Sequence, residues 1–250
     1  MNASFIITFA SPRLDNLRQT LRYLYRNHAE VIKKCELITV CQDNCEVASQ
    51  GFGTHLHYNL ETECMQLPRL TNFGVDHAHY QKIIVLESDR ILPTGYYAEI
   101  LQQLKAGIQI TPKLVWKLDH PYSDEEIAEN KFKYTEDART ANNQIGTRNM
   151  WSGNTAFMKT DFETAGKMDE NYQGYGWADS DMTNAMTAAG IKSIFRPEIE
   201  LHLWHPATTY GKGNQKQMFL KNGLRFCDKW NEPLPEWFRQ ELTQHSKSVL

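Results

Sequence analysis

A short apolar run in the first third of the chain limits the folds open to it. Residues 83–86 are four consecutive apolar residues, followed at once by Glu87, Ser88, Asp89 and Arg90. Such a run is typical of a strand buried on both faces, as in the parallel sheets of α/β proteins. The sequence therefore predicts a sheet covered by helices on both sides, with two carboxylates at the end of one strand.

Strand and helix patterns alternate along the rest of the chain. We expect strands at residues 4–10, 36–41, 55–58, 83–86, 153–159, 191–195 and 200–204. We expect helices at residues 11–25, 67–80, 93–105 and 182–189, and one or two more within 215–242, broken at Pro233 and Pro235. This alternation predicts a mostly parallel sheet wound by right-handed crossovers.

Composition narrows the class of protein. The formal net charge of −3 gives no basic excess for binding a nucleic acid backbone. The five cysteines, at positions 35, 41, 45, 64 and 227, lack paired spacing, which favours neither structural zinc nor a disulfide framework. No stretch approaches the roughly 20 apolar residues of a membrane helix, and the N-terminal apolar run is too short for a signal sequence. We therefore expect a soluble protein of a reducing compartment, the cytoplasm.

The strand end at Glu87 and Asp89 is the first candidate site. Residues two apart on a strand face the same side, so both carboxylates can converge on one partner. They repel each other unless a cation or a proton lies between them, and a divalent ion bridging to a phosphate would remove the repulsion. The alternative is that Asp89 caps the next turn and Arg90 neutralises Glu87.

The second cluster is the Gly- and aromatic-rich turn at residues 174–181. Tyr175 and Trp177 suit a flat, partly apolar surface such as a sugar ring. A carboxylate at Asp179 could act as general base for a hydroxyl. The alternative is that Asp179 or Asp181 caps the helix that begins here.

The third cluster is His202-Leu203-Trp204-His205-Pro206. In an extended strand, residues three apart point to opposite faces, so at most one of the two histidines should reach a given site. His205, at the exit of the strand, is the better candidate. The alternative is a packed, hydrogen-bonded histidine with no ligand.

The order of these clusters resembles the GT-A glycosyltransferases, both the family-2-like enzymes and the C-terminal region of the galactosyltransferases. In these enzymes an early strand and turn hold the nucleotide, and an acid after the second strand reads the base or ribose. Residues 4–11 resemble that strand and turn, Asp43 takes the place of the acid, and residues 72–74 resemble the NxG segment before the metal strand. Residues 87–89 correspond to the DxD motif, with Glu in the first position and Asp89 as the ligand by analogy.

The resemblance is most detailed between residues 151 and 192. This stretch resembles the galactosyltransferase pattern of a Gly-rich strand, a DE pair, a GWG-type turn and a helix ending in AAG. Ala178 stands where that family has Glu, and Asp179 where it has the catalytic Asp. Residues 202–206 resemble the later strand that carries a metal-binding histidine.

The resemblance implies an α/β protein with the Rossmann-like GT-A fold, in which helices flank a mixed, mostly parallel central sheet. It implies a metal-dependent inverting glycosyltransferase that moves a sugar from a nucleotide-diphosphate sugar to the hydroxyl of a glycan or other acceptor. Asp179 is the expected base, and Asp89, His205 and Glu87 are the expected ligands of Mn²⁺ or Mg²⁺. The expected substrate contacts are Ser11, Asp43, Trp151, Gly153, Tyr175, Trp177 and Asp181.

We expect one GT-A domain over residues 1–250. Its expected parts are a nucleotide-sugar-binding half at 1–110, a variable excursion at 111–149, an acceptor and catalytic half at 150–206, and C-terminal helices at 207–250. Three other functions stay open: a retaining transferase, a sugar nucleotidyltransferase on the same fold, and a non-catalytic nucleotide-sugar-binding module. The acceptor also stays open, and a lipid-linked acceptor would bring the protein into peripheral contact with a membrane.

Overall fold

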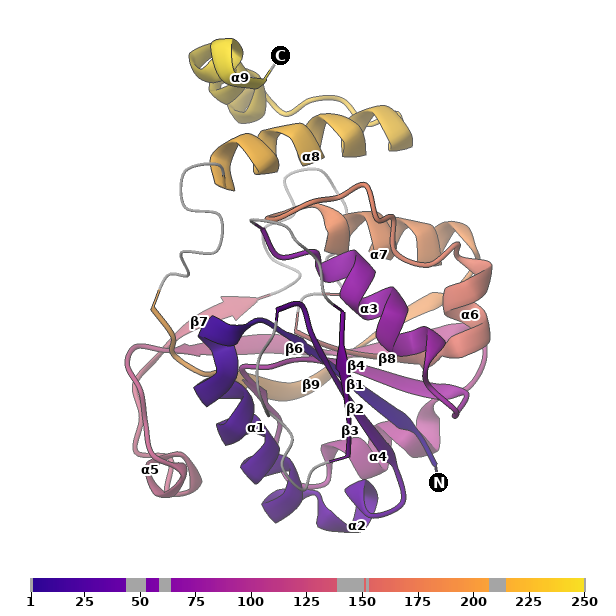
Figure 1. The fold of residues 1–250 in the computed structure, drawn as a ribbon, viewed down its shortest axis with the longest axis vertical. Coiled ribbons are helices and arrows are strands. Elements are labelled where there is room, and N and C mark those ends of the chain that lie inside the picture. The colour runs from indigo at the N-terminus through magenta and orange to yellow at the C-terminus, as the bar shows by residue number, and fades with distance from the viewer. Residues whose placement is uncertain are drawn as a thin grey trace.

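The computed structural model describes residues 2–43, 53–58, 64–138, 151, 153–206 and 215–249, which form an α/β fold around one sheet (Figure 1). Within these ranges eight strands of the sheet follow the order β3-β2-β1-β4-β8-β6-β9-β5, and a ninth, β7, pairs with β6 outside this path. The strands are β1 (Ser4–Phe9), β2 (Glu36–Cys41), β3 (Thr54–His57), β4 (Lys82–Glu87), β5 (Arg90–Ile91), β6 (Ile108–Leu118), β7 (Tyr134–Ala138), β8 (Asn154–Met158) and β9 (Lys192–His202).

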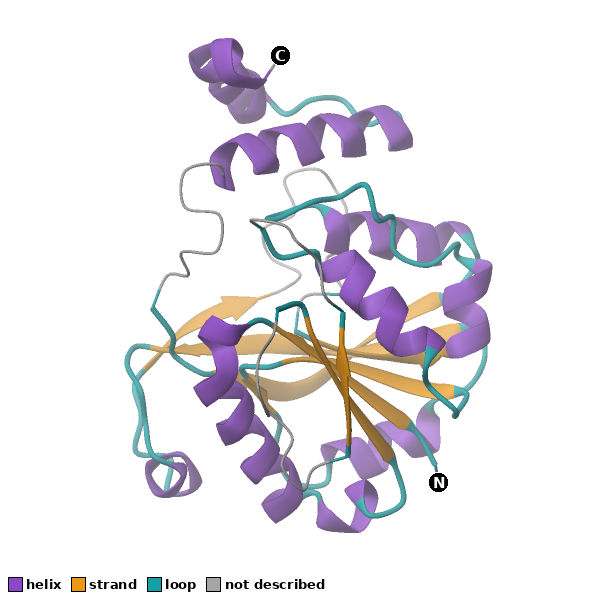
Figure 2. Ribbon diagram, viewed as in Figure 1, coloured by secondary structure: helices purple, strands orange, loops and turns teal. Residues whose placement is uncertain are grey.

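Helices cover both faces of this sheet (Figure 2), as the apolar strands predict. A short 3₁₀ turn, η1 (Ser11–Arg13), precedes the first of them. The helices are α1 (Leu14–Asn27), α2 (Ala29–Ile32), α3 (Leu67–Asp76), α4 (Tyr96–Gln103), α5 (Asp124–Ala128), α6 (Lys159–Thr164), α7 (Ala178–Ala188), α8 (Gln215–Trp230) and α9 (Glu236–Val249).

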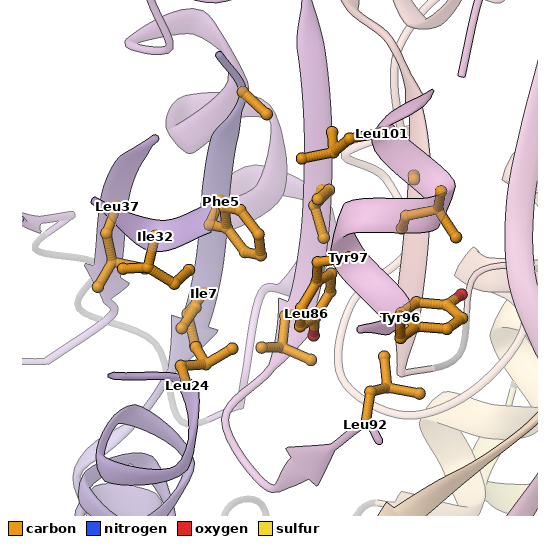
Figure 3. Close-up of a cluster of buried hydrophobic side chains, with 14 of the residues drawn as sticks. Phe5, Ile7, Leu24, Ile32, Leu37, Leu86, Leu92, Tyr96, Tyr97 and Leu101 are labelled. Atoms are coloured by element: carbon orange, nitrogen blue, oxygen red, sulfur yellow. The ribbon is translucent and has the colours of Figure 1, made fainter. Parts of the chain in front are cut away.

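The parallel half of the sheet, β3-β2-β1-β4, holds the strands with the clearest apolar runs. All six residues of β1 are buried, and β1 pairs with β2 on one side and β4 on the other. Phe5 and Ile7 pack on the face covered by α1, α2 and α4 (Figure 3). Ile6 packs on the opposite face with residues of α3, α6 and α7. Because both faces are covered, β1, β2 and β4 carry apolar runs without strict alternation, whereas β3 at the edge of the sheet does not.

The second half of the sheet differs from the prediction: the short strands β5 and β7 were not predicted, and two long strands differ as well. β6 was not predicted, and β9 runs unbroken from Lys192 to His202 where two strands were expected. Both contain a proline, which lacks the N–H that a regular ladder uses. The pairing of β6 with β9 shifts register between Pro112 and Leu114, and this irregularity accommodates Pro112 and Pro197.

The direction of pairing also changes in this half. β8 is antiparallel to β4 and to β6, and β5 and β7 are antiparallel to their partners, whereas β6 and β9 are parallel. The sheet is therefore mixed, with its parallel strands concentrated at the N-terminal side.

The expected excursion at residues 111–149 contains regular structure. Residues 111–118 belong to β6, and α5 and β7 follow. α5 begins with a capping box, in which Ser123 and Glu126 bond each other's backbone N–H groups. Residues 139–149 of this stretch lie outside the described residues.

The two C-terminal helices confirm the expected pair broken near Pro233 and Pro235. The Asn222 side chain of α8 donates to the carbonyl groups of Gln173, Tyr175 and Gly176. Arg225 pairs with Asp169 at 2.7 Å. α8 is thereby attached to the turn that leads into α7.

Two further features concern the helices and the cysteines. Among the described helices, none is both long and apolar enough to cross a membrane. Cys35, Cys64 and Cys227 are free, whereas Cys41 is disulfide-bonded.

Candidate active site and metal centre

Backbone pairing at the carboxyl end of β4 brings Asp89 beside the end of β9. Arg90 lies opposite His202 in the β5–β9 pair. The Leu203 N–H donates to the Asp89 carbonyl at 2.9 Å. Two segments more than 110 residues apart in the sequence are thus fixed against each other at one edge of the sheet.

Asp89, His202 and His205 present one ligand atom each to a common point. Asp89 Oδ2 lies 3.5 Å from His202 Nε2 and 3.3 Å from His205 Nε2. The two Nε2 atoms are 3.0 Å apart. Metal–ligand bonds of about 2.0–2.2 Å at right angles place neighbouring ligand atoms about 3 Å apart. The three side chains therefore fit a single divalent cation, and they form the one such group of acids, histidines and cysteines in the described residues.

The expectation that only one histidine could reach the site is wrong. β9 ends at His202, and the residues after it are not in a strand. The opposite-face rule applies only to extended backbone, so it does not govern His205. Its ring turns back toward His202, with the ring centroids 5.1 Å apart.

The electrostatic environment favours the metal-binding forms of Asp89 and His202. Burial raises the pKa of Asp89, but hydrogen bonds from His202 and His205 and the charge of Arg90 outweigh it. The pKa of Asp89 therefore lies well below its usual range. Burial and the charge of Arg90 lower the pKa of His202. An ionised carboxylate and a neutral imidazole are the ligand forms of these side chains.

Glu87 is placed apart from this group. Arg90 Nε and Nη2 donate to Glu87 Oε2 at 2.8 and 2.5 Å. This matches the alternative in which Arg90 neutralises Glu87. The backbone of Glu87 also holds Gly153, because the Glu87 N–H donates to the Gly153 carbonyl at 2.8 Å. Gly153 has φ 95°, a conformation that favours glycine, and this hydrogen bond fixes it beside the end of β4.

Ser11 and Asp43 lie together at the carboxyl ends of β1 and β2. The Ser11 N–H donates to Asp43 Oδ1 at 3.0 Å and to Oδ2 at 3.2 Å. Arg13, two residues after Ser11, brings its Nε within 4.0 Å of Asp89 Oδ2. Arg13 is not among the site residues predicted from the sequence, although its basic side chain shortly after the first strand is a signal for it.

Asp179 lies in the first turn of α7, where the helix dipole favours a carboxylate. The turn before it depends on left-handed backbone, with φ 87° at Gly176 and φ 72° at Trp177. The Thr183 hydroxyl donates to the Asp179 carbonyl at 2.8 Å, which fixes the backbone of this turn. Asp179 is partly exposed.

The aromatic residues of this turn differ in exposure. Tyr175 is 64% exposed and presents a ring to solvent. Trp177 packs on Phe219, Phe226 and Phe238, with ring centroids 5.5, 5.1 and 5.7 Å away. Of the two, Tyr175 is the one whose ring is open to solvent.

Trp151 and Asp181, two of the expected substrate contacts, are both buried in this structure. Trp151 is buried, and its Nε1–H donates to Gln109 Oε1 at 2.9 Å within the core. Asp181 is buried and accepts hydrogen bonds from Tyr172, Trp230 and Lys229. Both act in packing, and the helical pattern around Asp181 could not reveal its partners on α8.

One family model and several solved structures are similar to this chain. Residues 134–206 match the family model described as the N-terminal domain of galactosyltransferase. A structure of GalNAc-T7 with UDP, GalNAc and Mn²⁺ is 14% identical with a TM-score of 0.63, over 99% of this chain and 57% of that chain. A Drosophila β1,4-galactosyltransferase 7 mutant with manganese, UDP-Gal and xylobiose is 14% identical with a TM-score of 0.50, over 78% of this chain and 64% of that chain.

The chain thus spans less than two thirds of the length of either structure. No curated protein matches it significantly. The family model overlaps the stretch at residues 151–192 on which the resemblance mainly rests, and the fold covers nearly the whole chain. The predicted resemblance is confirmed: this chain has the GT-A glycosyltransferase fold, with a galactosyltransferase-type segment at residues 134–206.

Proposed function

We propose that the protein is a glycosyltransferase that uses a nucleotide-diphosphate sugar and a divalent cation held by Asp89, His202 and His205. The observation that carries the proposal is the convergence of these three ligand atoms within 3.5 Å of one another. Two nitrogen ligands favour Mn²⁺ over Mg²⁺, which prefers oxygen ligands. When bound, the ion supplies positive charge for the departing diphosphate.

The proposed donor is a UDP-sugar. GalNAc-T7 was solved with UDP and Mn²⁺, and the galactosyltransferase with UDP-Gal and manganese. In this chain Asp43 and the Ser11 backbone would hold the nucleoside end of the donor, as in the nucleotide half of the fold. Arg13, 4.0 Å from Asp89, would face the diphosphate. Gly153 lets the backbone approach the sugar closely, because no side chain intervenes.

The proposed reaction inverts the anomeric centre. Asp179 would take the proton from the acceptor hydroxyl as its oxygen attacks the anomeric carbon. The C–O bond to the diphosphate breaks on the opposite face, and the diphosphate leaves with the bonding electrons. Tyr175 offers an exposed ring on which the acceptor or donor sugar can stack.

The donor and metal are tested by thermal shift with a panel of nucleotide sugars, with and without Mn²⁺. A ligand that binds the folded state raises the melting temperature. We expect UDP-sugars to raise it only in the presence of Mn²⁺. Equal shifts without metal, or no shift with any nucleotide sugar, would contradict the proposal.

The reaction class is tested by product analysis with the donor found in this screen. NMR of the first-formed product gives its anomeric configuration. Inversion supports Asp179 as base, and retention supports a retaining transferase. Release of nucleotide with transfer of a nucleotidyl group would instead identify a nucleotidyltransferase, and donor binding without turnover a binding module.

We also propose a cytoplasmic location and a glycan or other hydroxyl acceptor. The disulfide at Cys41 weighs against this location, because disulfides are uncommon in cytosolic proteins. Cell fractionation is the test: recovery of the protein in the cytosolic fraction supports the location, and recovery in a secretory fraction contradicts it. Binding to vesicles with a lipid-linked glycan would identify a membrane-associated acceptor.

A further inference from the structure

Arg90 is a buried cation surrounded by three carboxylates. It is 7% exposed, and it ion-pairs with Glu87, Asp89 and Glu200. Its Nη2 lies 2.5 Å from Glu87 Oε2, its Nε 3.2 Å from Asp89 Oδ1, and its Nη1 3.4 Å from Glu200 Oε1. Nε also donates a hydrogen bond to Glu87 Oε2 at 2.8 Å, so its contact with Asp89 Oδ1 is an ion pair, and the one guanidinium lies within ion-pair distance of all three acids.

These contacts divide the two oxygens of Asp89. Oδ1 faces Arg90, whereas Oδ2 faces the imidazoles of His202 and His205 at 3.5 and 3.3 Å. Rotation of the carboxylate would break the contact with Arg90. The guanidinium therefore selects which oxygen of Asp89 is turned toward the two histidines.

Glu200 fixes Arg90 from the far side. Its side chain is fully buried, and it lies two residues before His202 on β9. Residues two apart on a strand face the same side, so Glu200 and His202 share a face. A buried carboxylate is costly without a cation beside it, and Arg90 supplies that cation. One strand thus carries both a metal ligand and the acid that holds the positioning arginine.

The charges of this group are not balanced by Arg90 alone. Glu87, Asp89 and Glu200 are three acids around one arginine, with Arg13 a further 4.0 Å from Asp89. A divalent cation at Asp89 supplies the missing positive charge. A lysine could neutralise one acid, but it lacks the planar fork that reaches three.

We propose that Arg90, held by Glu200 and Glu87, is a positioning residue for the metal centre and presents Asp89 Oδ2 to the ion. This role rests on the proposed function for the identity of the ion. In this proposal Arg90 orients the metal ligand Asp89, and Glu87 binds Arg90 and is not itself a metal ligand. Glu200, outside every motif of the sequence, becomes part of the same assembly.

The test is Mn²⁺ affinity measured by calorimetry and by the EPR signal of free Mn²⁺, without nucleotide. Loss of an outer-shell partner of a metal ligand typically lowers metal affinity by about 10–100-fold. We expect Arg90→Lys and Arg90→Met to weaken Mn²⁺ binding by about tenfold or more. Glu200→Gln should weaken it in the same direction, because Arg90 loses its anchor.

Arg196→Met is the matched control. Arg196 also lies on β9 and also pairs with two acids, Glu99 and Glu198, away from Asp89. This variant should bind Mn²⁺ as the wild type does. Circular dichroism on every variant gives the folded fraction, and Arg90→Lys, which keeps the charge, is the variant for which folding is best preserved.

Each result has one meaning. Weaker Mn²⁺ binding by folded Arg90→Lys, with Arg196→Met unchanged, supports the positioning role. Affinity of Arg90→Lys within twofold of wild type, or a loss that only follows the unfolded fraction, overturns this role and leaves the proposed function intact. No Mn²⁺ binding by the wild-type chain overturns the proposed metal centre and this role together.

Discussion

Glu87 and Asp89 are two residues apart, yet they have different surroundings. Glu87 meets the guanidinium of Arg90, whereas Asp89 meets Arg90 with one oxygen and two imidazoles with the other. A carboxylate already neutralised by arginine gains less from a cation than one that faces neutral imidazoles. The difference between the two acids therefore comes from their neighbours and not from their type.

At the same scale, Asp179 carries the proposed chemistry of transfer. We predict that Asp179→Asn lowers the transfer rate by about 10²–10⁴-fold, because general-base catalysis contributes about that much. Donor affinity should stay near the wild-type value, since the amide keeps the shape of the side chain. The measurement is single-turnover transfer together with calorimetric donor binding.

Asp15→Asn is the control for this variant, because Asp15 also lies in the first turn of a helix. It should leave transfer and binding unchanged. Donor binding that weakens in proportion to the rate in Asp179→Asn would argue against the role as base.

At the scale of elements, residues 72–74 serve the packing of α3. The Asn72 side chain donates to the Met168 carbonyl at 2.9 Å and accepts from the Met168 N–H at 3.1 Å. Gly74 lies so close to the sheet that an added Cβ would be 2.4 Å from Ile6 Cγ2 and 3.0 Å from Val40 Cγ2. The NxG segment thus holds α3 against β1 and β2.

We predict that Gly74→Ala destabilises the protein by about 1–2 kcal/mol. Overpacking of a core contact costs about 1–3 kcal/mol, and the better helix propensity of alanine offsets up to about 1 kcal/mol. Urea unfolding measures the change. His77→Ala, on the exposed end of the same helix, is the control, and a Gly74→Ala protein more stable than wild type would contradict the close approach.

The ion pair between Arg225 of α8 and Asp169, before α7, should stabilise the fold less at acidic pH. Burial raises the pKa of Asp169, but hydrogen bonds from Arg225 and Asn171 outweigh it and lower that pKa to about 2. The unfolded chain titrates this carboxyl near its ordinary pKa of about 3.9. Its contribution is therefore complete above that pH and is lost as the pH falls toward 2.

We expect this contribution to be about 1 kcal/mol, since Arg225 is partly exposed and solvent screens the pair. The free energy of unfolding in urea at pH 5 and pH 3 measures it. Asp169→Asn should be less stable than wild type at pH 5 and closer to it at pH 3. An equal difference at both pH values would show that the pair does not titrate in this range.

At the scale of the whole molecule, the sequence predicts the N-terminal half well. β1, β2 and β4 are apolar on both faces, so their positions could be read from the residues alone. β6 and β9 could not, because Pro112 and Pro197 mask strands that a shift in register repairs only in the assembled sheet. The local sequence pattern was sufficient to predict strands with continuous apolar runs, and it was insufficient for strands that contain a proline.

The candidate site shows the same division. Asp89 could be selected because the end of a buried strand is a local feature. The pairing of His202 with His205 depends on where the chain turns after β9, and the role of Trp151 depends on Gln109 in another strand. Contacts between distant segments are not encoded in the spacing of either segment.

The central claim is that Asp89, His202 and His205 bind one divalent cation. The most direct measurement is a Mn²⁺ titration followed by EPR, with wild type, His202→Ala, His205→Ala and the exposed-histidine control His77→Ala. We predict one bound ion per chain in wild type and His77→Ala. Each of the other two variants should lose at least about tenfold in affinity, since even outer-shell partners contribute that much. Wild-type affinity in both His202→Ala and His205→Ala would contradict the metal centre.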